Sequence, residues 1–151
     1  MLPNATLYHF GILTSTMHNA WVRQVCGRLE SRYRYSNTIV YNNFPWPCVS
    51  ATPSSRSNGT NRDEGVAATK YNDAIESAAQ AVLNARAQFP NESLAHLYGA
   101  NMPPVLVKVH ALLDKAVDAA YVVDGGAKTY ASDAERVAFL FKRYQQLTSL
   151  I

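Results

Sequence analysis

Cysteine is scarce in this sequence, and the usual companions of cysteine in metal sites are missing beside it. The 151 residues include two cysteines, Cys26 and Cys48, with no CxxC pair and no histidine at ligand spacing. This pattern excludes a disulfide framework and a zinc site built on cysteine. The sequence also lacks a glycine-rich phosphate loop and the HExxH and GxSxG motifs. It therefore contains no recognisable catalytic or cofactor-binding motif.

Long apolar runs are missing as well. No uncharged stretch is apolar enough over the length that is needed to cross a bilayer. The first residues, MLPNATLYHF, lack the basic region and the apolar core of a signal peptide. These absences predict a cytoplasmic protein without a membrane partner.

Acidic residues are nearly absent from the first 50 positions. This part contains four arginines and a single acidic residue, Glu30, whereas basic and acidic side chains balance over the remainder. The excess positive charge therefore lies on Arg23, Arg28, Arg32 and Arg34. Arginine suits bidentate contact with phosphate or guanine. A solvated helix end with one internal ion pair explains the same cluster, so the charge pattern alone leaves both interpretations open.

Apolar residues are abundant enough to build a core. Hydrophobic residues make up 48% of the chain and charged residues 17%, which is typical of a folded globular protein. Residues 6–13 are rich in aromatic and β-branched types and predict a strand, with Gly11 at a bend or a close backbone approach. Thr14 or Ser15 is then expected to cap a helix that runs to Leu29. Its apolar stripe recurs every four residues, at Met17, Trp21, Val25 and Leu29.

Three further features of the first half are assigned from their neighbours. His18 adjoins the stripe, which predicts a helix-surface or capping histidine. Residues 39–41 predict a short buried strand that ends before Pro45, because proline cannot donate to a ladder. Trp46 lies between two prolines and is interpreted as a packing anchor rather than a platform for stacking bases.

The run from Glu30 to Tyr35 predicts a one-sided polar edge. In an extended conformation Glu30, Arg32 and Arg34 point one way, and the intervening residues point the other way. A glutamate accepts from the cytosine amino group, and an arginine donates a bidentate pair to guanine. Glu30 and Arg32 together match one C·G pair, but a surface ion pair between them explains the same spacing.

The remainder of the chain has a helical pattern. Residues 51–65 are rich in Ser, Thr, Asn and Gly, which predicts a linker or mobile loop. Apolar spacing predicts one helix over 71–89, a second that opens at Pro103 and Pro104, and a third after Ser132. His110 lies on the apolar face of the second helix and is expected to be a hydrogen-bonded core histidine.

These elements define the predicted fold class and domains. The fold class is α+β, mainly α: short strands and a capped helix, followed by a small three-helix C-terminal bundle. The predicted domains are 1–50, a part with short strands and a capped helix, and 66–151, a helical C-terminal domain, joined by the linker at 51–65.

Three blocks of the sequence resemble a known family. They are FGILTSTMHNAWVRQVCGRLESRYRYSNTIVYNNFPWP, LAHLYGANMPP and ERVAFLFKRYQ, and the resemblance covers nearly the whole chain apart from the linker. The chain is similar to the C-terminal end of the MmeI-like enzymes, the type IIL branch of single-chain restriction and modification proteins. The family usually has an aspartate where this chain has Gly99.

The resemblance implies a function and a set of residues. Full-length members have an endonuclease region, an S-adenosylmethionine-dependent adenine-N6 methyltransferase core, a target recognition domain and a helical C-terminal domain. This chain resembles the last two, so no cofactor is expected within it. In that family the positions of Glu30 and Arg32 vary together and are associated with reading one base pair. Arg23, Arg28 and Arg34 are then the candidates for contacts with DNA phosphates.

Two functions remain as alternatives. The first is a DNA recognition and support fragment of a site-specific DNA methyltransferase and restriction enzyme, with double-stranded DNA as its partner and no activity alone. The second is a protein interaction module that docks on the methyltransferase core of the full-length protein without touching DNA.

Overall fold

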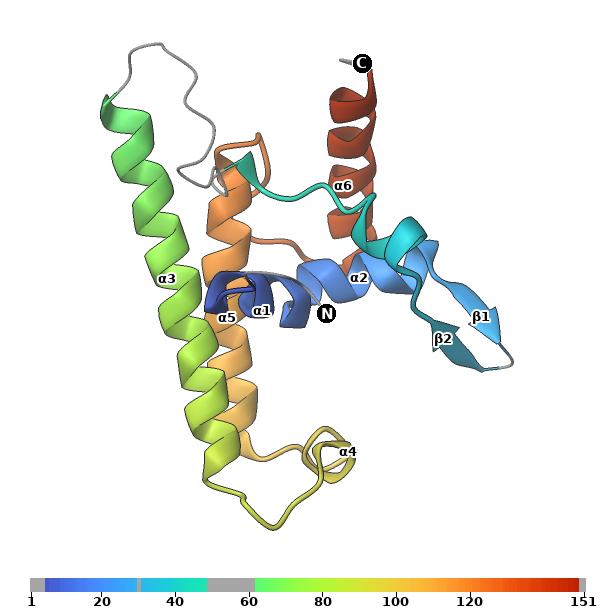
Figure 1. The fold of residues 1–151 in the computed structure, drawn as a ribbon, viewed down its shortest axis with the longest axis vertical. Helices are drawn as coiled ribbons and strands as arrows, with labels where there is room; N and C mark the ends of the chain where they lie inside the picture. Colours follow the sequence, from blue (N-terminus) through green and yellow to red (C-terminus); the bar gives the residue numbers. More distant parts are fainter. Residues whose placement is uncertain (1–4, 30, 49–61, 150–151) are drawn as a thin grey trace.

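The computed structural model describes residues 5–29, 31–48 and 62–149 (Figure 1). Its elements, in chain order, are α1 (Leu7–Thr14), α2 (Thr16–Val25), β1 (Gly27–Leu29), β2 (Arg32–Arg34), η1 (Asn37–Tyr41), α3 (Arg62–Ala87), α4 (Leu94–Leu97), α5 (Pro104–Val122) and α6 (Asp133–Thr148). The predicted fold class is confirmed: the molecule is mainly helical, with a two-stranded hairpin near the N-terminus and three long helices in the C-terminal part.

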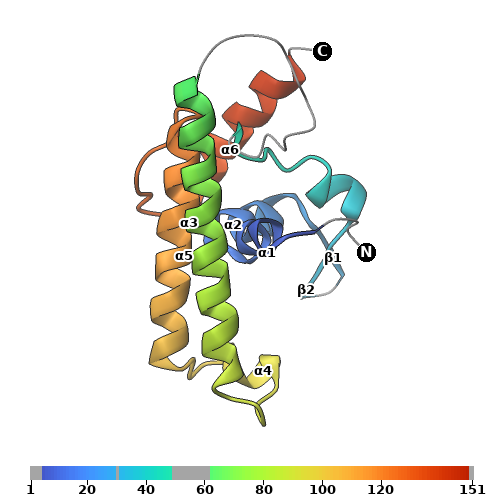
Figure 2. The same ribbon diagram turned by 60° about the vertical axis from the view of Figure 1, so that its left-hand side comes forward.

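The two longest helices form one side of the molecule. α3 and α5 lie antiparallel and side by side, and α1 packs across both of them (Figures 1 and 2). α2 leads away from this pair of helices, and α6 packs against α2. The β1–β2 hairpin leaves the far end of α2 and projects from the body (Figure 1).

Residues 7–13 lie in the helix α1 and Thr6 is its N-cap, so the strand predicted over 6–13 is wrong. Tyr8 and Ile12, four residues apart, are both buried on one side of this helix. Gly11 lies so close to α3 that a Cβ atom there would be 2.7 Å from Cγ2 of Ile75. This confirms the close approach expected at Gly11. Packing against α3 overrides the β-propensity of the aromatic and β-branched residues.

α2 begins where the sequence predicts and ends earlier. The hydroxyl of Ser15 accepts a hydrogen bond from the backbone nitrogen of His18, so Ser15 is the N-cap. The helix ends at Val25 instead of Leu29, because the chain turns extended at Cys26 and enters β1 at Gly27, a poor helix former. His18 is buried, so its predicted place on the helix surface is wrong.

Residues 39–41 do not form the predicted buried strand. They belong to η1, a single π-helical turn, in which Val40 is buried and the side chain of Ile39 is 53% exposed. The indole nitrogen of Trp21 donates to the carbonyl of Val40 at 3.1 Å. The buried indole therefore obtains its acceptor from this turn, which no local pattern of strand residues reveals.

α5 and α6 begin where the sequence predicts, whereas α3 begins at Arg62, nine residues before the predicted start at 71. Proline opens α5, and the hydroxyl of Ser132 accepts from the backbone nitrogen of Glu135 at the start of α6. Most of the predicted linker at 51–65 lies outside the described residues, and its last four residues belong to α3. Among the described residues, no helix combines the length and apolar character that a membrane span requires.

One hydrophobic core unites the N-terminal elements with the long helices. The hydroxyl of Tyr121, on α5, donates to the carbonyl of Pro45 at 2.9 Å. Ring contacts surround Trp46, which agrees with its predicted role as a packing anchor. The largest fully buried side chains of this core include Ile12, Met17, Trp21, Val40, Ile75, Val82, Leu113, Val117, Tyr121 and Leu140.

Candidate nucleic-acid interface

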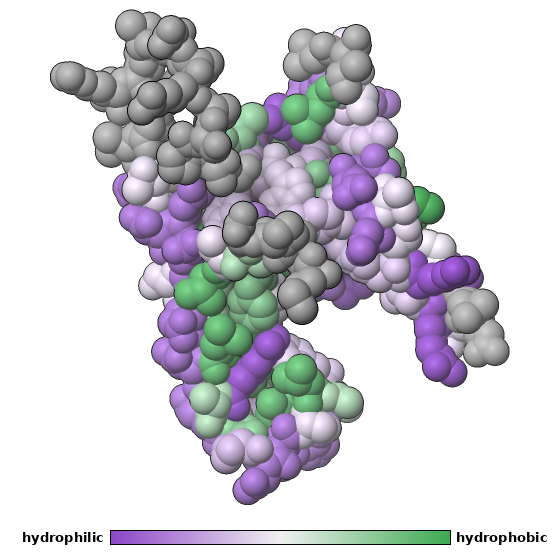
Figure 3. Space-filling view, viewed as in Figure 1, coloured by the Kyte–Doolittle hydropathy of each residue, from purple (hydrophilic) through white to green (hydrophobic). Residues whose placement is uncertain are grey.

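The β1–β2 hairpin places most of the predicted DNA-binding residues on a projecting arm. Its strands pair antiparallel, with Gly27 opposite Arg34, Arg28 opposite Tyr33 and Leu29 opposite Arg32. The side chains of Arg28, Arg32, Tyr33 and Arg34 are all exposed. Figure 3 shows this hairpin as a hydrophilic projection from the body.

The arginines of the hairpin divide between its two faces. Residues that are paired across an antiparallel ladder share a face, so Arg28 lies beside Tyr33. The Arg28 guanidinium lies 4.8 Å from the centre of the Tyr33 ring, and its Nη2 donates to the Tyr33 hydroxyl at 3.1 Å. Arg32 and Arg34 lie on the opposite face, because side chains alternate along a strand. Glu30 lies outside the described residues.

Arg23 is set apart from the other three arginines. It lies on α2, where it forms an ion pair with Asp133 in the first turn of α6. Both side chains are about half exposed, with exposed fractions of 54% and 43%. An exposed pair of this kind contributes little stability, so Asp133 holds Arg23 only weakly.

The base of the hairpin is attached to α2 by Tyr35 and His18. The Tyr35 hydroxyl and Nε2 of His18 are hydrogen-bonded at 3.2 Å, and the two ring centres are 5.9 Å apart. Phe44 packs edge-on against the His18 ring at 4.6 Å. Burial lowers the pKa of His18 from 6.5 to about 4, so the imidazole is neutral at neutral pH.

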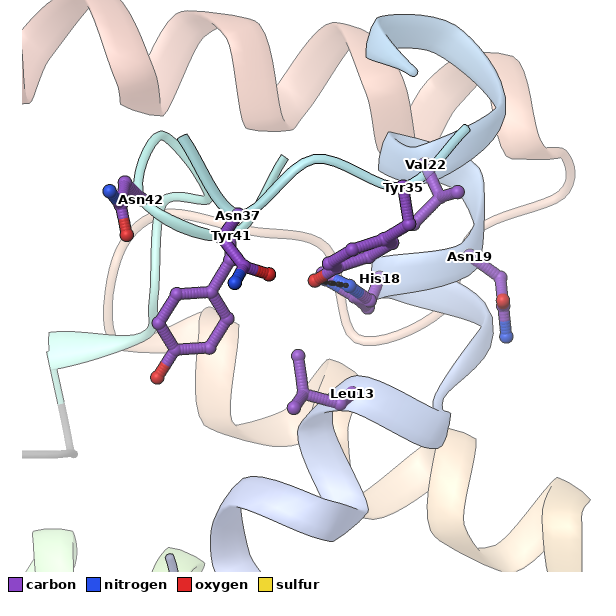
Figure 4. A pocket seen from close by; sticks show the side chains of 8 residues that line it. All are labelled: Leu13, His18, Asn19, Val22, Tyr35, Asn37, Tyr41 and Asn42. Atoms are coloured by element: carbon purple, nitrogen blue, oxygen red, sulfur yellow. Dashed lines mark hydrogen bonds between the residues drawn. The ribbon is translucent and has the colours of Figure 1, made fainter. Parts of the chain in front are cut away.

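A pocket of about 670 Å³ opens beside this attachment (Figure 4). None of the described side chains that line it is an arginine, lysine, aspartate or glutamate. The lining residues are Leu13, His18, Asn19, Val22, Tyr35, Asn37, Tyr41 and Asn42. Apart from the asparagines around Tyr41, no local pattern in the sequence indicates this pocket, because its lining is assembled from four separate segments.

A second pocket, of about 520 Å³, lies between α1, α4 and α5. Nε of Arg86 donates to the Tyr98 hydroxyl at 2.8 Å, and that hydroxyl lies 2.6 Å from Nε2 of His110. This contact confirms the predicted hydrogen bond of His110, but the side chain is only partly buried, so its predicted place in the core is wrong. Burial, together with the charge of Arg86, lowers the pKa of His110. Figure 3 shows hydrophobic side chains gathered over α4 and the neighbouring part of α1.

The described residues contain no cluster of three or more His, Cys, Asp or Glu side chains that is able to hold a metal ion. The chemistry that they offer is hydrogen bonding and positive charge, concentrated on the hairpin and its base.

Comparison with protein families divides the chain into two matches. Residues 1–48 match the family described as the MmeI target recognition domain, and residues 67–151 match the family described as the MmeI C-terminal domain. Together the two families cover all of the described elements apart from the start of α3.

Two further proteins are similar to this chain over nearly its whole length. DNA methyltransferase A of Bacillus subtilis (strain 168) is 36% identical over 149 residues, which is 98% of this chain. A solved structure of the type IIL restriction-modification enzyme MmeI in complex with DNA is 47% identical over 97% of this chain, with a TM-score of 0.76. The chain spans 14% of the length of the first protein and 17% of the second.

Proposed function

This chain belongs to the MmeI family, as the end of a target recognition domain followed by a C-terminal domain, and from that premise we propose that it binds double-stranded DNA. The proposed role is sequence recognition and support within a site-specific adenine-N6 DNA methyltransferase and restriction enzyme. Such an enzyme works on cytoplasmic DNA, and the methyltransferase core of the full-length protein is the second proposed partner.

The observation that carries this proposal is the hairpin with its exposed arginines. A two-stranded β-ribbon fits the major groove of B-DNA, where base edges are distinguishable. The hairpin stands clear of the body and presents Arg28 on one face and Arg32 and Arg34 on the other. Positive charge on a projecting ribbon is typical of an element that enters a groove between two phosphate backbones.

Within the hairpin we assign different roles to different residues. Arg32 donates a bidentate pair to guanine, and Glu30 accepts from the amino group of the paired cytosine. Arg28 and Arg34 contact phosphates and set the register of the hairpin on the duplex. Arg23 is a weaker phosphate candidate, because a phosphate has to compete with Asp133 for its guanidinium.

Methyl transfer belongs, in this proposal, to residues outside this chain. S-adenosylmethionine carries a ribose whose hydroxyls a carboxylate commonly binds. The described lining of the pocket beside the hairpin contains no carboxylate, and the carboxylate of Asp114 in the second pocket accepts two hydrogen bonds from Thr16. These two pockets therefore do not fit the cofactor, and no catalytic step is assigned to the described residues.

The test is a titration of the chain against a labelled mixed-sequence duplex at ~50 mM and ~200 mM salt. The variant Arg32→Ala with Arg34→Ala is compared with the control Lys108→Ala with Lys115→Ala. The control removes the same charge from exposed positions on α5. We expect the hairpin variant to bind more weakly, with its salt slope reduced by about 1 for each arginine that contacts a phosphate. Equal effects of the two variants would contradict the proposal.

Base readout requires a separate variant. Glu30→Lys with Arg32→Asp exchanges the donor and acceptor positions, so we expect the preference to move from C·G to the reversed pair. Competition between duplexes that differ at one pair measures this preference. An equal loss of affinity for every duplex would assign Glu30 and Arg32 to phosphate contact or structure. Wild-type chain that binds no duplex at either salt concentration would favour the alternative, a module that docks on the methyltransferase core.

A further inference from the structure

We propose that the pocket at the base of the hairpin binds the sugar-phosphate backbone of the DNA strand through uncharged side chains. This inference rests on the proposed function and adds a second contact surface to it. The surface consists of Asn37, Tyr41 and Asn42, which line the pocket beside Tyr35.

The position of the pocket follows from chain continuity. Arg34 is the last residue of β2, and Tyr35, the next residue, forms part of the pocket wall. The hydrogen bond between Tyr35 and His18 ties this wall to α2. A ribbon in the major groove is flanked by the two phosphate backbones. The surface at the base of such a ribbon therefore faces a backbone, while Arg32, further along the hairpin, faces the groove.

The pocket offers hydrogen-bond donors that the described part of the protein does not use. The amides of Asn37 and Asn42 and the hydroxyl of Tyr41 have no hydrogen-bond partner among the described residues. The adjacent Asn43 differs, because its Nδ2 donates to the carbonyls of Thr38 and Ile39, each at 3.1 Å. Asn43 thus stabilises η1, and the side chains of Tyr41 and Asn42 remain available to bind a ligand. Asparagine and tyrosine side chains are regular donors to DNA phosphates.

The arrangement of the lining suits a nucleotide backbone. Figure 4 shows the Asn37 amide between the Tyr41 ring and the Tyr35 ring, with Leu13 facing them across the pocket. Leu13 and Val22 supply apolar surface for the carbons of the deoxyribose. None of the described residues that line the pocket has a carboxylate, so none of them opposes a phosphate with negative charge. His18 in the wall is neutral and adds no charge of its own.

Uncharged contacts leave a signature that separates them from the arginines. An arginine that neutralises a phosphate releases counterions, so its removal lowers the salt dependence of binding. An amide or a hydroxyl releases none. Loss of these groups therefore weakens binding to every sequence while the salt slope keeps its wild-type value.

The experiment measures Kd for a mixed-sequence duplex at several salt concentrations, with the 151-residue chain. The test variant is Asn37→Ala with Asn42→Ala, and Tyr41→Phe is a second variant that removes one hydroxyl and keeps the ring. The control is Asn101→Ala, an exposed asparagine distant from the pocket in the sequence and absent from its lining. Thermal unfolding of each variant verifies that the fold is kept.

We expect Kd to rise about tenfold in the double asparagine variant and roughly two to five times in Tyr41→Phe, because neutral hydrogen bonds are lost. The control is expected to leave Kd unchanged. The salt slope stays at the wild-type value in all of them. An unchanged Kd in both pocket variants would overturn the inference and would favour a protein segment as the occupant of the pocket. A reduced salt slope would overturn it too, because the loss would then act through the arginines.

The two proposals fail in different ways. Absence of DNA binding by the wild-type chain contradicts the proposed function itself. Binding that depends on Arg32 and Arg34 but is indifferent to Asn37, Tyr41 and Asn42 keeps the proposed function and removes the backbone contact.

Discussion

The carboxylate of Asp114 accepts two hydrogen bonds from Thr16, a residue 98 positions away in the sequence. Both the backbone nitrogen and the hydroxyl of Thr16 donate to it, each at 2.7 Å. Thr16 is the first residue of α2, where helical nitrogens lack partners within the helix and a negative charge is favourable. Asp114 on α5 therefore fixes the start of the helix whose other end carries the hairpin.

Replacement of Asp114 by alanine is expected to destabilise the protein by about 1–3 kcal/mol, because two hydrogen bonds to a charged acceptor are lost. Urea denaturation measures this free energy of unfolding. Asp73→Ala, at an exposed position of α3, is the matched control and is expected to change it by less than about 0.5 kcal/mol. Equal effects at the two positions would show that the contact with Thr16 is not stabilising.

Gly11→Ala is expected to cost about 1–3 kcal/mol, the usual penalty of overpacking a core. The new methyl group would lie 2.7 Å from Ile75 and 3.3 Å from both Ala79 and Leu113, so α1 has to move away from α3 and α5. Gly27→Ala is the control, since a Cβ atom there has no atom within 4 Å. A Gly11 variant as stable as the Gly27 variant would contradict the close packing of α1.

The stability of the protein is expected to fall as the pH is lowered from 6.5 to about 4, because of His18. In this interval the imidazole of the unfolded chain binds a proton, whereas the buried imidazole of the folded chain stays neutral. The unfolded state is therefore favoured progressively, by up to about 3 kcal/mol from this group. Above the unfolded pKa both states are neutral, and the contribution of His18 no longer changes.

Urea denaturation at a series of pH values checks this expectation. His18→Gln cannot titrate, so its stability is expected to depend less on pH than that of the wild type. His110, whose pKa is also lowered, acts in the same direction in both proteins and cancels from the comparison. Parallel stability profiles for wild type and variant would show that His18 is not buried as a neutral group.

Several features of this protein were predictable from local sequence. Ser15, Pro104 and Ser132 mark helix starts correctly, because caps and first-turn prolines depend on residues within one helical turn. The alternation of Arg32, Tyr33 and Arg34 agrees with the strand that contains them. The resemblance to the type IIL enzymes is confirmed by the family matches, since its motifs are contiguous in the chain.

The division into 1–50, 51–65 and 66–151 stays a prediction. The shared core gives a physical reason to test it, because Ile12 and Trp21 pack in one cluster with Ile75, Val117 and Leu140. A helical part without the first elements would lose apolar partners on several of its helices. Proteolysis and unfolding of the separate parts measure their independence directly.

The sequence by itself determined where α2, α5 and α6 begin, which residues carry the excess charge, and which family the chain resembles. These features depend on residues that are neighbours along the chain. Tertiary structure alone decided that residues 7–14 are helical, that His18 is buried and that a pocket opens at the base of the hairpin. Each of these depends on contacts between distant segments: α1 with α3, His18 with Tyr35 and Phe44, and Trp21 with the carbonyl of Val40. The free energy gained by burying such side chains exceeds the differences in local propensity, so the partners against which a segment packs determine its structure.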